Sequence, residues 1–219
     1  MSKDLVIIGA GGFGREASLL VEEINDSLAG EDRWNLLGFV DEDLTKRGAQ
    51  MRGYPVLGGW DALAGLHPAV MVICVVGDPQ VKQKMVEAAA WQGSRFATLV
   101  HPGVFISKDV QLGKGVLINR GAILTTNIKI GDHVSVNPGC GIGHDVVIED
   151  YSTLMWRVNI SGAVKVGQGC MIGTGATVLQ GLKVGDNSTV GAGAVVTTVL
   201  PAGSKVAGLP ARSIKKKDY

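Results

Sequence analysis

The sequence has few aromatic residues and no excess of either charge. Aromatic residues make up 5% of the 219 residues, although hydrophobic residues in total reach 46%. The core must therefore be built from Val, Ile, Leu and Ala side chains. The formal net charge of +1 gives no electrostatic case for binding nucleic acid or an acidic membrane surface. The one basic run, Lys215 to Lys217, is expected to be a solvated tail.

Cysteine motifs and long apolar runs are also missing. Cys74, Cys140 and Cys170 lie inside apolar stretches without CxxC or Cys/His spacing, which predicts reduced core residues rather than metal ligands or disulfides. No segment reaches the apolar length of a membrane helix, and the apolar stretch at residues 5–14 has no basic leader or cleavage site. We therefore expect a cytoplasmic protein that does not enter the membrane.

Glycine is abundant, with 32 residues, and an aliphatic residue recurs at every sixth position. From Ile106 to Val196, sixteen consecutive positions at this spacing are Ile, Leu or Val, and glycine often follows directly. A period of six does not fit an amphipathic helix or an alternating strand, but it fits short strands joined by tight turns. Three such hexads close a triangular coil, so residues eighteen apart stack and the aliphatic side chains fill its interior. We expect the glycines to permit the sharp corners.

This repeat resembles that of the hexapeptide-repeat acyltransferases, whose fold is the left-handed parallel β-helix. The resemblance covers roughly residues 102 to 212. It predicts the fold more strongly than the chemistry, because γ-class carbonic anhydrases and some non-catalytic subunits share the same coil. We therefore expect a β-helix domain over residues 101–219, with a C-terminal tail, after an α/β domain over residues 1–100.

The first hundred residues predict a half-Rossmann βαβαβ domain that binds a nucleotide. Gly9, Gly11 and Gly14 match G-x-G-x-x-G between an apolar strand and a helix, where backbone N–H groups can approach a phosphate. Asp41 ends the next strand and is a candidate for the ribose hydroxyls, and the third strand ends at Gly77. The glycines could also serve close packing alone. Because a full dinucleotide fold needs two such halves, we expect a nucleotide-linked substrate rather than NAD.

His144 raises a question of its own, because it lies in a segment built for packing. It follows the inward-facing Ile142 by two residues, so it should point outward at a corner, with Thr126 and Gly162 as its stacked neighbours. An ordinary exposed histidine is one interpretation. The adjacent carboxylate of Asp145, however, can fix the tautomer of a general base. The other three histidines lack the spacing of a zinc site, so we expect no metal.

With a nucleotide-binding half-domain ahead of a solenoid that carries "GHD", the whole chain resembles the bacterial sugar O-/N-acetyltransferases of the NeuD/PglD type. The resemblance implies that His144 is the base, that Asp145 assists it and that acetyl-CoA is the acetyl donor. It places the nucleotide-sugar contacts on Gly11, Gly12, Phe13, Asp41, Glu42 and Gly77, with Asn137 near the reacting amine. It places the acetyl-CoA contacts on Thr153, Ser161, Gly162, Thr174, Ala192, Gly208, Pro210 and Arg212. Thr153 stands where some members have a histidine.

These features predict an acetyl-CoA-dependent N-acetyltransferase acting on the amino group, at C4, of a nucleotide-linked dideoxy sugar used for surface glycans. Two alternatives are O-acetylation of a sialic-acid-like sugar and a non-catalytic scaffold that binds a nucleotide sugar. We expect a homotrimer with each active site between two subunits. Trp156 and Arg157 are open to two interpretations, a subunit contact or a substrate contact.

Overall fold

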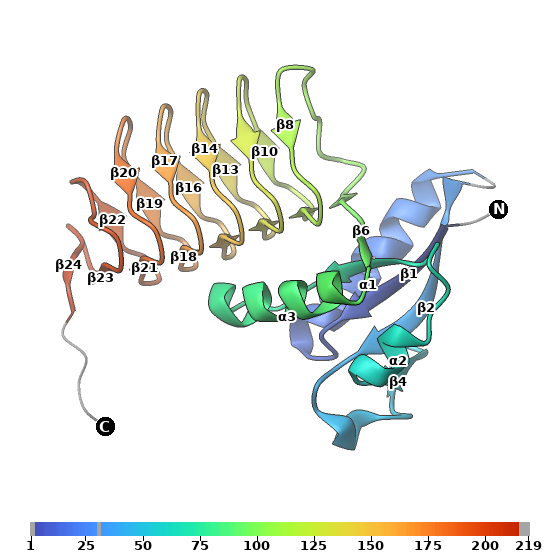
Figure 1. Cartoon of the computed structure of the whole chain (residues 1–219). Coiled ribbons are helices and arrows are strands. Elements are labelled where there is room, and N and C mark those ends of the chain that lie inside the picture. The colour runs from blue at the N-terminus through green and yellow to red at the C-terminus, as the bar shows by residue number, and fades with distance from the viewer. Residues whose placement is uncertain (1–2, 30–31, 215–219) are drawn as a thin grey trace. The chain divides into compact units, whose positions relative to one another are not determined.

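The computed structural model describes residues 3–29 and 32–214. By its internal contacts the chain divides into two compact units, residues 1–102 and 103–219, both drawn in Figure 1. The basic run at 215–217 lies outside the described residues. In the described part of the chain, no helix combines the length and the apolarity that a membrane span requires.

The first unit is a six-stranded mixed sheet with helices, in the order β3-β4-β2-β1-β5-β6. Neighbouring strands are parallel except for the antiparallel pair β3 and β4. Its elements are β1 (Lys3–Ile8), α1 (Gly12–Ser27), β2 (Trp34–Val40), η2 (Leu44–Lys46), β3 (Gln50–Met51), β4 (Tyr54–Gly58), α2 (Trp60–Ala64), β5 (Met71–Cys74), α3 (Pro79–Trp91), β6 (Arg95–Phe96) and β7 (Leu99–Val100).

Strand β1 is the centre of this sheet. Its residues Leu5 to Ile8 are at most 1% exposed, as expected for a parallel strand covered on both faces. The chain continues to β2 on one side of β1 and returns to β5 on the other. The carboxyl ends of β1 and β5 therefore border the crevice in which open α/β sheets bind ligands. The hairpin of β3 and β4 and the short β6 and β7 were not part of the predicted βαβαβ order.

The second unit is a three-sheet parallel β-helix, as the repeat predicted, and Figure 1 shows its successive coils. The first sheet contains β10 (Ile123–Leu124), β13 (Gly141–Ile142), β16 (Asn159–Ile160), β19 (Thr177–Val178) and β22 (Val195–Val196). The second contains β8 (Gln111–Leu112), β11 (Lys129–Ile130), β14 (Val147–Ile148), β17 (Lys165–Val166) and β20 (Lys183–Val184). The third includes β9 (Leu117–Ile118), β12 (Ser135–Val136), β15 (Thr153–Leu154), β18 (Met171–Ile172), β21 (Thr189–Val190), β23 (Lys205–Ala207) and β24 (Arg212–Ser213).

The strand register confirms the predicted stacking of residues eighteen apart. Ile142 pairs with Leu124 on one neighbouring strand and with Ile160 on the other. The repeat positions face the interior, where Val136 and Val166 have no exposed surface. The aliphatic hexad residues thus form a continuous core along the solenoid.

The glycines that follow the repeat positions have a different role from the predicted one. Gly143 is not among the residues with positive φ. Instead, a β-carbon at this position would lie 2.7 Å from the backbone nitrogen of Gly162 on the next coil. The left-handed conformation occurs two residues later, where Asp145 has a φ of 60°. Glycine is therefore required for close stacking of the coils, whereas the third residue of the turn makes the corner.

Candidate active site

The solenoid part of the candidate site is a corner formed by stacked turns. The turn at residues 143–146 joins β13 of the first sheet to β14 of the second. We call this turn and its stacked equivalents at 107–110, 125–128, 161–164 and 179–182 the His144 corner. The side chains of His144 and Asp145 are both exposed there. The second and third turn positions point away from the aliphatic interior, which leaves both side chains accessible to a ligand.

His144 and Asp145 form a hydrogen-bonded pair. The Nδ1 atom of His144 lies 2.7 Å from Oδ2 of Asp145. Hydrogen bonds from His144 and Asn127 lower the pKa of the Asp145 carboxyl, so it is ionised at neutral pH. An ionised carboxylate can only accept a hydrogen bond, so the imidazole proton lies on Nδ1. The Nε2 atom of the neutral ring then carries the lone pair that a general base needs.

Gly162 fixes where the imidazole lies. A β-carbon at Gly162 would come within 2.4 Å of Nε2 of His144, so the ring lies directly against the glycine backbone of the next coil. The carbonyl of His144 also accepts a 2.7 Å hydrogen bond from the N–H of Ala163. The predicted neighbours Ser161 and Gly162 are therefore part of the same corner as the histidine.

Apart from Thr153, the other predicted acetyl-CoA contacts lie at a different corner of the coil. Thr174 and Ala192 are exposed on turns that join the third sheet to the first. The segment containing Gly208, Pro210 and Arg212 packs beside this corner, because the Gly208 carbonyl accepts the N–H of Val195 at the start of β22. The first sheet separates these residues from the His144 corner within one chain.

Three further residues lie away from the His144 corner. Asn137 and Thr153 were predicted site residues, and Trp156 had two possible roles. Asn137 is 3% exposed, and its Nδ2 atom donates a 2.9 Å hydrogen bond to the Leu154 carbonyl. Thr153 lies on β15 of the third sheet and has no exposed surface. Trp156 is 44% exposed on the corner that carries Thr174. Within a single chain, these side chains do not join His144 and Asp145.

The glycine turn of the first unit follows β1 at the crevice between β1 and β5. Gly9 has a φ of 108°, and a β-carbon at Gly14 would lie 2.1 Å from the Gly9 carbonyl oxygen. These two glycines allow the tight turn and the close approach of α1. A β-carbon at Gly11 or Gly77 would meet nothing within 4 Å. The turn therefore has both the packing role and an open backbone that a phosphate could approach.

Asp41 ties the glycine turn to the loop after β2. Its carboxylate accepts hydrogen bonds from the Ala10 N–H at 2.7 Å, the Asp43 N–H at 2.9 Å and the Lys46 ammonium at 3.1 Å. Partial burial raises the pKa of Asp41, but these hydrogen bonds outweigh burial and hold it below its ordinary value. The carboxylate predicted to bind ribose is thus already used to orient the loops around the crevice.

Glu42 has a partner that its position in the sequence did not indicate. Its Oε1 atom accepts a 3.2 Å hydrogen bond from the indole N–H of Trp60, the first residue of α2. Lys46, which pairs with Asp41, was also missed. The first contact joins the loop after β2 to the start of α2, and the second lies within the loop after β2, five residues apart. Both depend on loop conformations for which the sequence has no periodic signal.

A buried lysine, Lys82, lies on the first turn of α3. Lys82 has no exposed surface, and burial lowers the pKa of its ammonium group to about 7. Burial also raises the pKa of the neighbouring Cys74 thiol to about 12. Asp78, the N-cap of this helix, accepts the N–H groups of Gln80 and Val81. No feature of the sequence distinguished Lys82 from the exposed lysines of an amphipathic helix.

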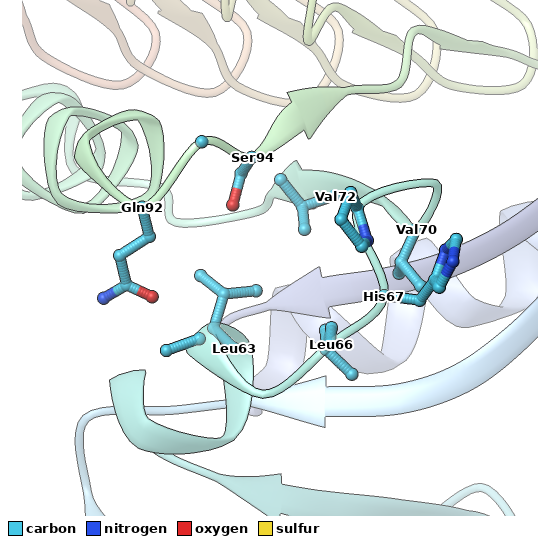
Figure 2. Close-up of a pocket in the computed structure, with 10 residues that line it drawn as sticks. Leu63, Leu66, His67, Val70, Val72, Gln92 and Ser94 are labelled. Atoms are coloured by element: carbon cyan, nitrogen blue, oxygen red, sulfur yellow. The ribbon is translucent and has the colours of Figure 1, made fainter.

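A cavity of about 280 Å³ lies in the first unit near the amino end of β5. Figure 2 shows Leu63, Leu66 and Val72 around it, with Gln92 and Ser94 on another side. None of the predicted site residues lines it. Because open α/β sheets bind ligands at the carboxyl ends of their strands, we do not assign this cavity to the site. Among the described residues, no three His, Cys, Asp or Glu side chains are grouped to hold a metal ion.

Comparison with protein families gives a match for each unit. Residues 4–89 match the PglD N-terminal domain. Residues 163–198 match the bacterial transferase hexapeptide (six repeats). A search of curated proteins found no match.

Several solved structures are similar to nearly the whole chain. PerB from Caulobacter crescentus, in complex with CoA and GDP-perosamine, is 30% identical, with 97% of both chains covered and a TM-score of 0.85. WeeI from Acinetobacter baumannii is 31% identical, covering 96% of this chain and 99% of its own, with a TM-score of 0.85. The acetyltransferase domain of PglB from Neisseria gonorrhoeae is 29% identical, covering 97% of this chain and all of its own, with a TM-score of 0.85. The chain belongs to the PglD-type family of hexapeptide-repeat sugar acetyltransferases.

Proposed function

We propose that this protein transfers the acetyl group of acetyl-CoA to the amino group of a nucleotide-linked amino sugar. The observation that carries the proposal is the His144–Asp145 pair, which is exposed at a coil corner with Nδ1 bonded to Asp145, so that Nε2 is the nitrogen that would accept a proton. Similarity to enzymes solved with CoA, GDP-perosamine or acetyl coenzyme A supports the choice of both substrates. We assign the acceptor more narrowly to the C4 amine of a dideoxy sugar used for surface glycans, made in the cytoplasm.

The proposed reaction is a direct displacement at the thioester. The neutral amine attacks the carbonyl carbon, and a C–N bond forms while Nε2 of His144 takes one proton from the nitrogen. Asp145 stabilises the imidazolium that results, because its charge lies 2.7 Å from Nδ1. Backbone N–H groups of a coil corner stabilise the oxyanion. The C–S bond then breaks, and the proton held by His144 passes to the departing thiolate.

In this proposal the nucleotide binds to the first unit. Gly11, Gly12 and Phe13 would present the start of α1 to the diphosphate, with Gly77 on the other side of the crevice. Asp41 would act by holding the Ala10 N–H and Lys46 in place, and Glu42 by its contact with Trp60. Asn137 does not lie beside His144 within one chain, so it would approach the reacting amine from a neighbouring subunit, through its amide oxygen, because its Nδ2 is bonded to the Leu154 carbonyl.

We also propose that the active enzyme is a homotrimer. The predicted acetyl-CoA contacts occupy two corners of one coil, with Ser161 and Gly162 at one and Thr174 and Ala192 at the other. A second copy would bring the two sets together if each cofactor lay between neighbouring solenoids. Light scattering should then give three times the chain mass, and an active monomer would contradict this arrangement.

A substrate panel tests the proposed function. Release of the CoA thiol is measured with UDP-, GDP- and dTDP-linked amino sugars, with a sialic-acid-like sugar and with no sugar. N-acetylation predicts thiol release that depends on one of the nucleotide-linked amines. Release only with the sialic-acid-like sugar would favour O-acetylation. If a nucleotide sugar binds but no sugar of the panel causes release of the CoA thiol, a non-catalytic scaffold would be favoured.

A further inference from the structure

A set of hydrogen bonds joins three stacked turns of the His144 corner. At its centre is Asp145, whose Oδ2 atom lies 2.7 Å from Nδ1 of His144. Its other oxygen, Oδ1, accepts a 2.5 Å hydrogen bond from Nδ2 of Asn127, eighteen residues earlier in the chain. Both oxygens of the carboxylate therefore have a partner at this corner, one from its own turn and one from the adjacent turn.

Asn127 is in turn held by the preceding coil. Its N–H donates a 3.2 Å hydrogen bond to Oδ2 of Asp109, and the Thr126 hydroxyl donates to the same oxygen. Hydrogen bonds from Ser107 and Thr126 lower the pKa of Asp109 to about 2, so this acceptor is ionised near neutral pH. Asn127 has a φ of 54°, a left-handed conformation that asparagine adopts more readily than most residues. Its amide is thus presented to Asp145 from a fixed backbone.

The amide of Asn127 is an uncharged hydrogen-bond donor, so it does not neutralise the carboxylate that supports His144 as a base. A lysine or arginine in its place would cancel the charge of Asp145, whereas an amide restrains the carboxylate and leaves its charge intact. A carboxylate bonded only to His144 could rotate about its Cβ–Cγ bond, and a donor from a separate coil opposes that rotation. The turns stacked around the pair carry the charged residues Lys108 and Asp109, and the turn at 161–164 carries none.

We propose that Asn127 is a positioning residue for acetyl transfer. By holding the Asp145 carboxylate, it keeps His144 in the tautomer and orientation that leave Nε2 free as the base. This inference rests on the proposed function, which supplies the role of His144. Asn127 acts through Asp145 and does not touch either substrate. Loss of its amide should therefore lower kcat and leave both KM values unchanged.

Asn127→Gly and the matched control Asn187→Gly isolate this role. Asn187 has a φ of 55° and is also exposed, but it lies at another corner. Glycine is compatible with the fold at position 127, because Gly181 has a φ of 73° at the equivalent position of the same corner. A positioned base contributes about 10²- to 10⁴-fold to the reaction rate. Poor orientation of the base in Asn127→Gly should remove only part of this contribution and lower kcat about tenfold. Asn187→Gly should keep the wild-type kcat.

NMR of the imidazole nitrogens separates this inference from the proposed function, because it needs no acetyl transfer. Wild-type protein and Asn187→Gly should carry the His144 proton on Nδ1, whereas Asn127→Gly should show a mixture of both tautomers. Asn127→Asp adds negative charge that favours the imidazolium, so it should move the acid limb of the kcat/KM profile to higher pH. If Asn127→Gly matches Asn187→Gly in tautomer, the inference is overturned. If no sugar is acetylated, the proposed function fails, but the tautomer comparison still decides the role of Asn127.

Discussion

The imidazole of His144 lies against the backbone of Gly162, so closely that a β-carbon at position 162 would come within 2.4 Å of Nε2. The two residues belong to successive coils of the same corner. Gly162 does not have a positive φ, so the need for glycine comes from the position of the ring and not from the backbone conformation. The orientation of the proposed base therefore depends on the absence of a side chain on the next coil.

Gly162→Ala should displace the His144 ring and lower kcat. A misplacement of about 1 Å can cost about a hundredfold in rate, so we expect a loss of that order with little change in thermal stability. The measurement is kcat in a double-mutant cycle with His144→Asn. In the His144→Asn background, Gly162→Ala should cost almost nothing further. Equal losses in both backgrounds would mean that Gly162 acts independently of the imidazole.

His144→Asn should remove the general base and lower kcat by about 10²- to 10⁴-fold. Asp145→Asn should cost less, because the imidazole is still present but poorly oriented. Some of the acceptor amine loses its proton to water before binding, so activity left in His144→Asn should rise at alkaline pH. The profile of kcat/KM against pH checks this. An unchanged profile with a near-normal rate in His144→Asn would remove His144 from the mechanism.

Asp41→Asn should raise the KM for the nucleotide sugar and leave the KM for acetyl-CoA nearly unchanged. The variant weakens hydrogen bonds from the Ala10 N–H and Lys46, and a charged hydrogen bond contributes about 1.5–3 kcal/mol, or about ten- to a hundredfold. Asp4→Asn is the matched control, because Asp4 accepts a 2.8 Å hydrogen bond from Asn35 at the amino end of β1, opposite the crevice. Equal effects on both KM values would argue against a separate nucleotide site in the first unit.

Lys82→Met should stabilise the protein most at and below neutral pH. Burial lowers the pKa of Lys82 to about 7 from 10.5, so between these values the unfolded chain binds more protons. The unfavourable contribution of Lys82 is therefore complete below about pH 7 and disappears as the pH rises towards 10.5. Denaturant unfolding from pH 6 to 10 should show a difference between variant and wild type that shrinks with pH. Lys84→Met, on an exposed position of the same helix, is the control. Destabilisation by Lys82→Met at every pH would mean that the contacts of the lysine outweigh the cost of burying it.

The solenoid could be predicted from the sequence almost in full, because its period is set by side chains that must face one interior. The register of Ile142 with Leu124 and Ile160 follows directly from counting eighteen residues. The hairpin of β3 and β4 was not predicted, because its two-residue strand β3 is too short to show a hydrophobic period. The role of Gly143 was predicted incorrectly, since steric contact between adjacent coils depends on backbone spacing that a repeat does not reveal.

The candidate site was predictable only in part. Counting along the repeat places His144 beside Gly162, but it does not reveal that Asn127 donates to Asp145. That contact depends on two left-handed residues, at 127 and 145, which turn their side chains towards each other. The contacts of Asp41 with Ala10 and Lys46 likewise depend on loop conformations, for which the sequence has no periodic signal.

Acetylation of an amine, with His144 as the base, can be compared directly with acetylation of a hydroxyl group. The most direct measurement pairs a nucleotide-linked 4-amino sugar with its 4-hydroxy counterpart, and follows CoA release and the position of the new acetyl group by NMR. We predict that wild-type protein acetylates only the amine, at nitrogen, and that His144→Asn does so at least a hundredfold more slowly. Equal acetylation of the hydroxyl sugar would show that the acceptor is not specifically an amine, and an N-acetylation rate that His144→Asn does not change would show that His144 is not the base.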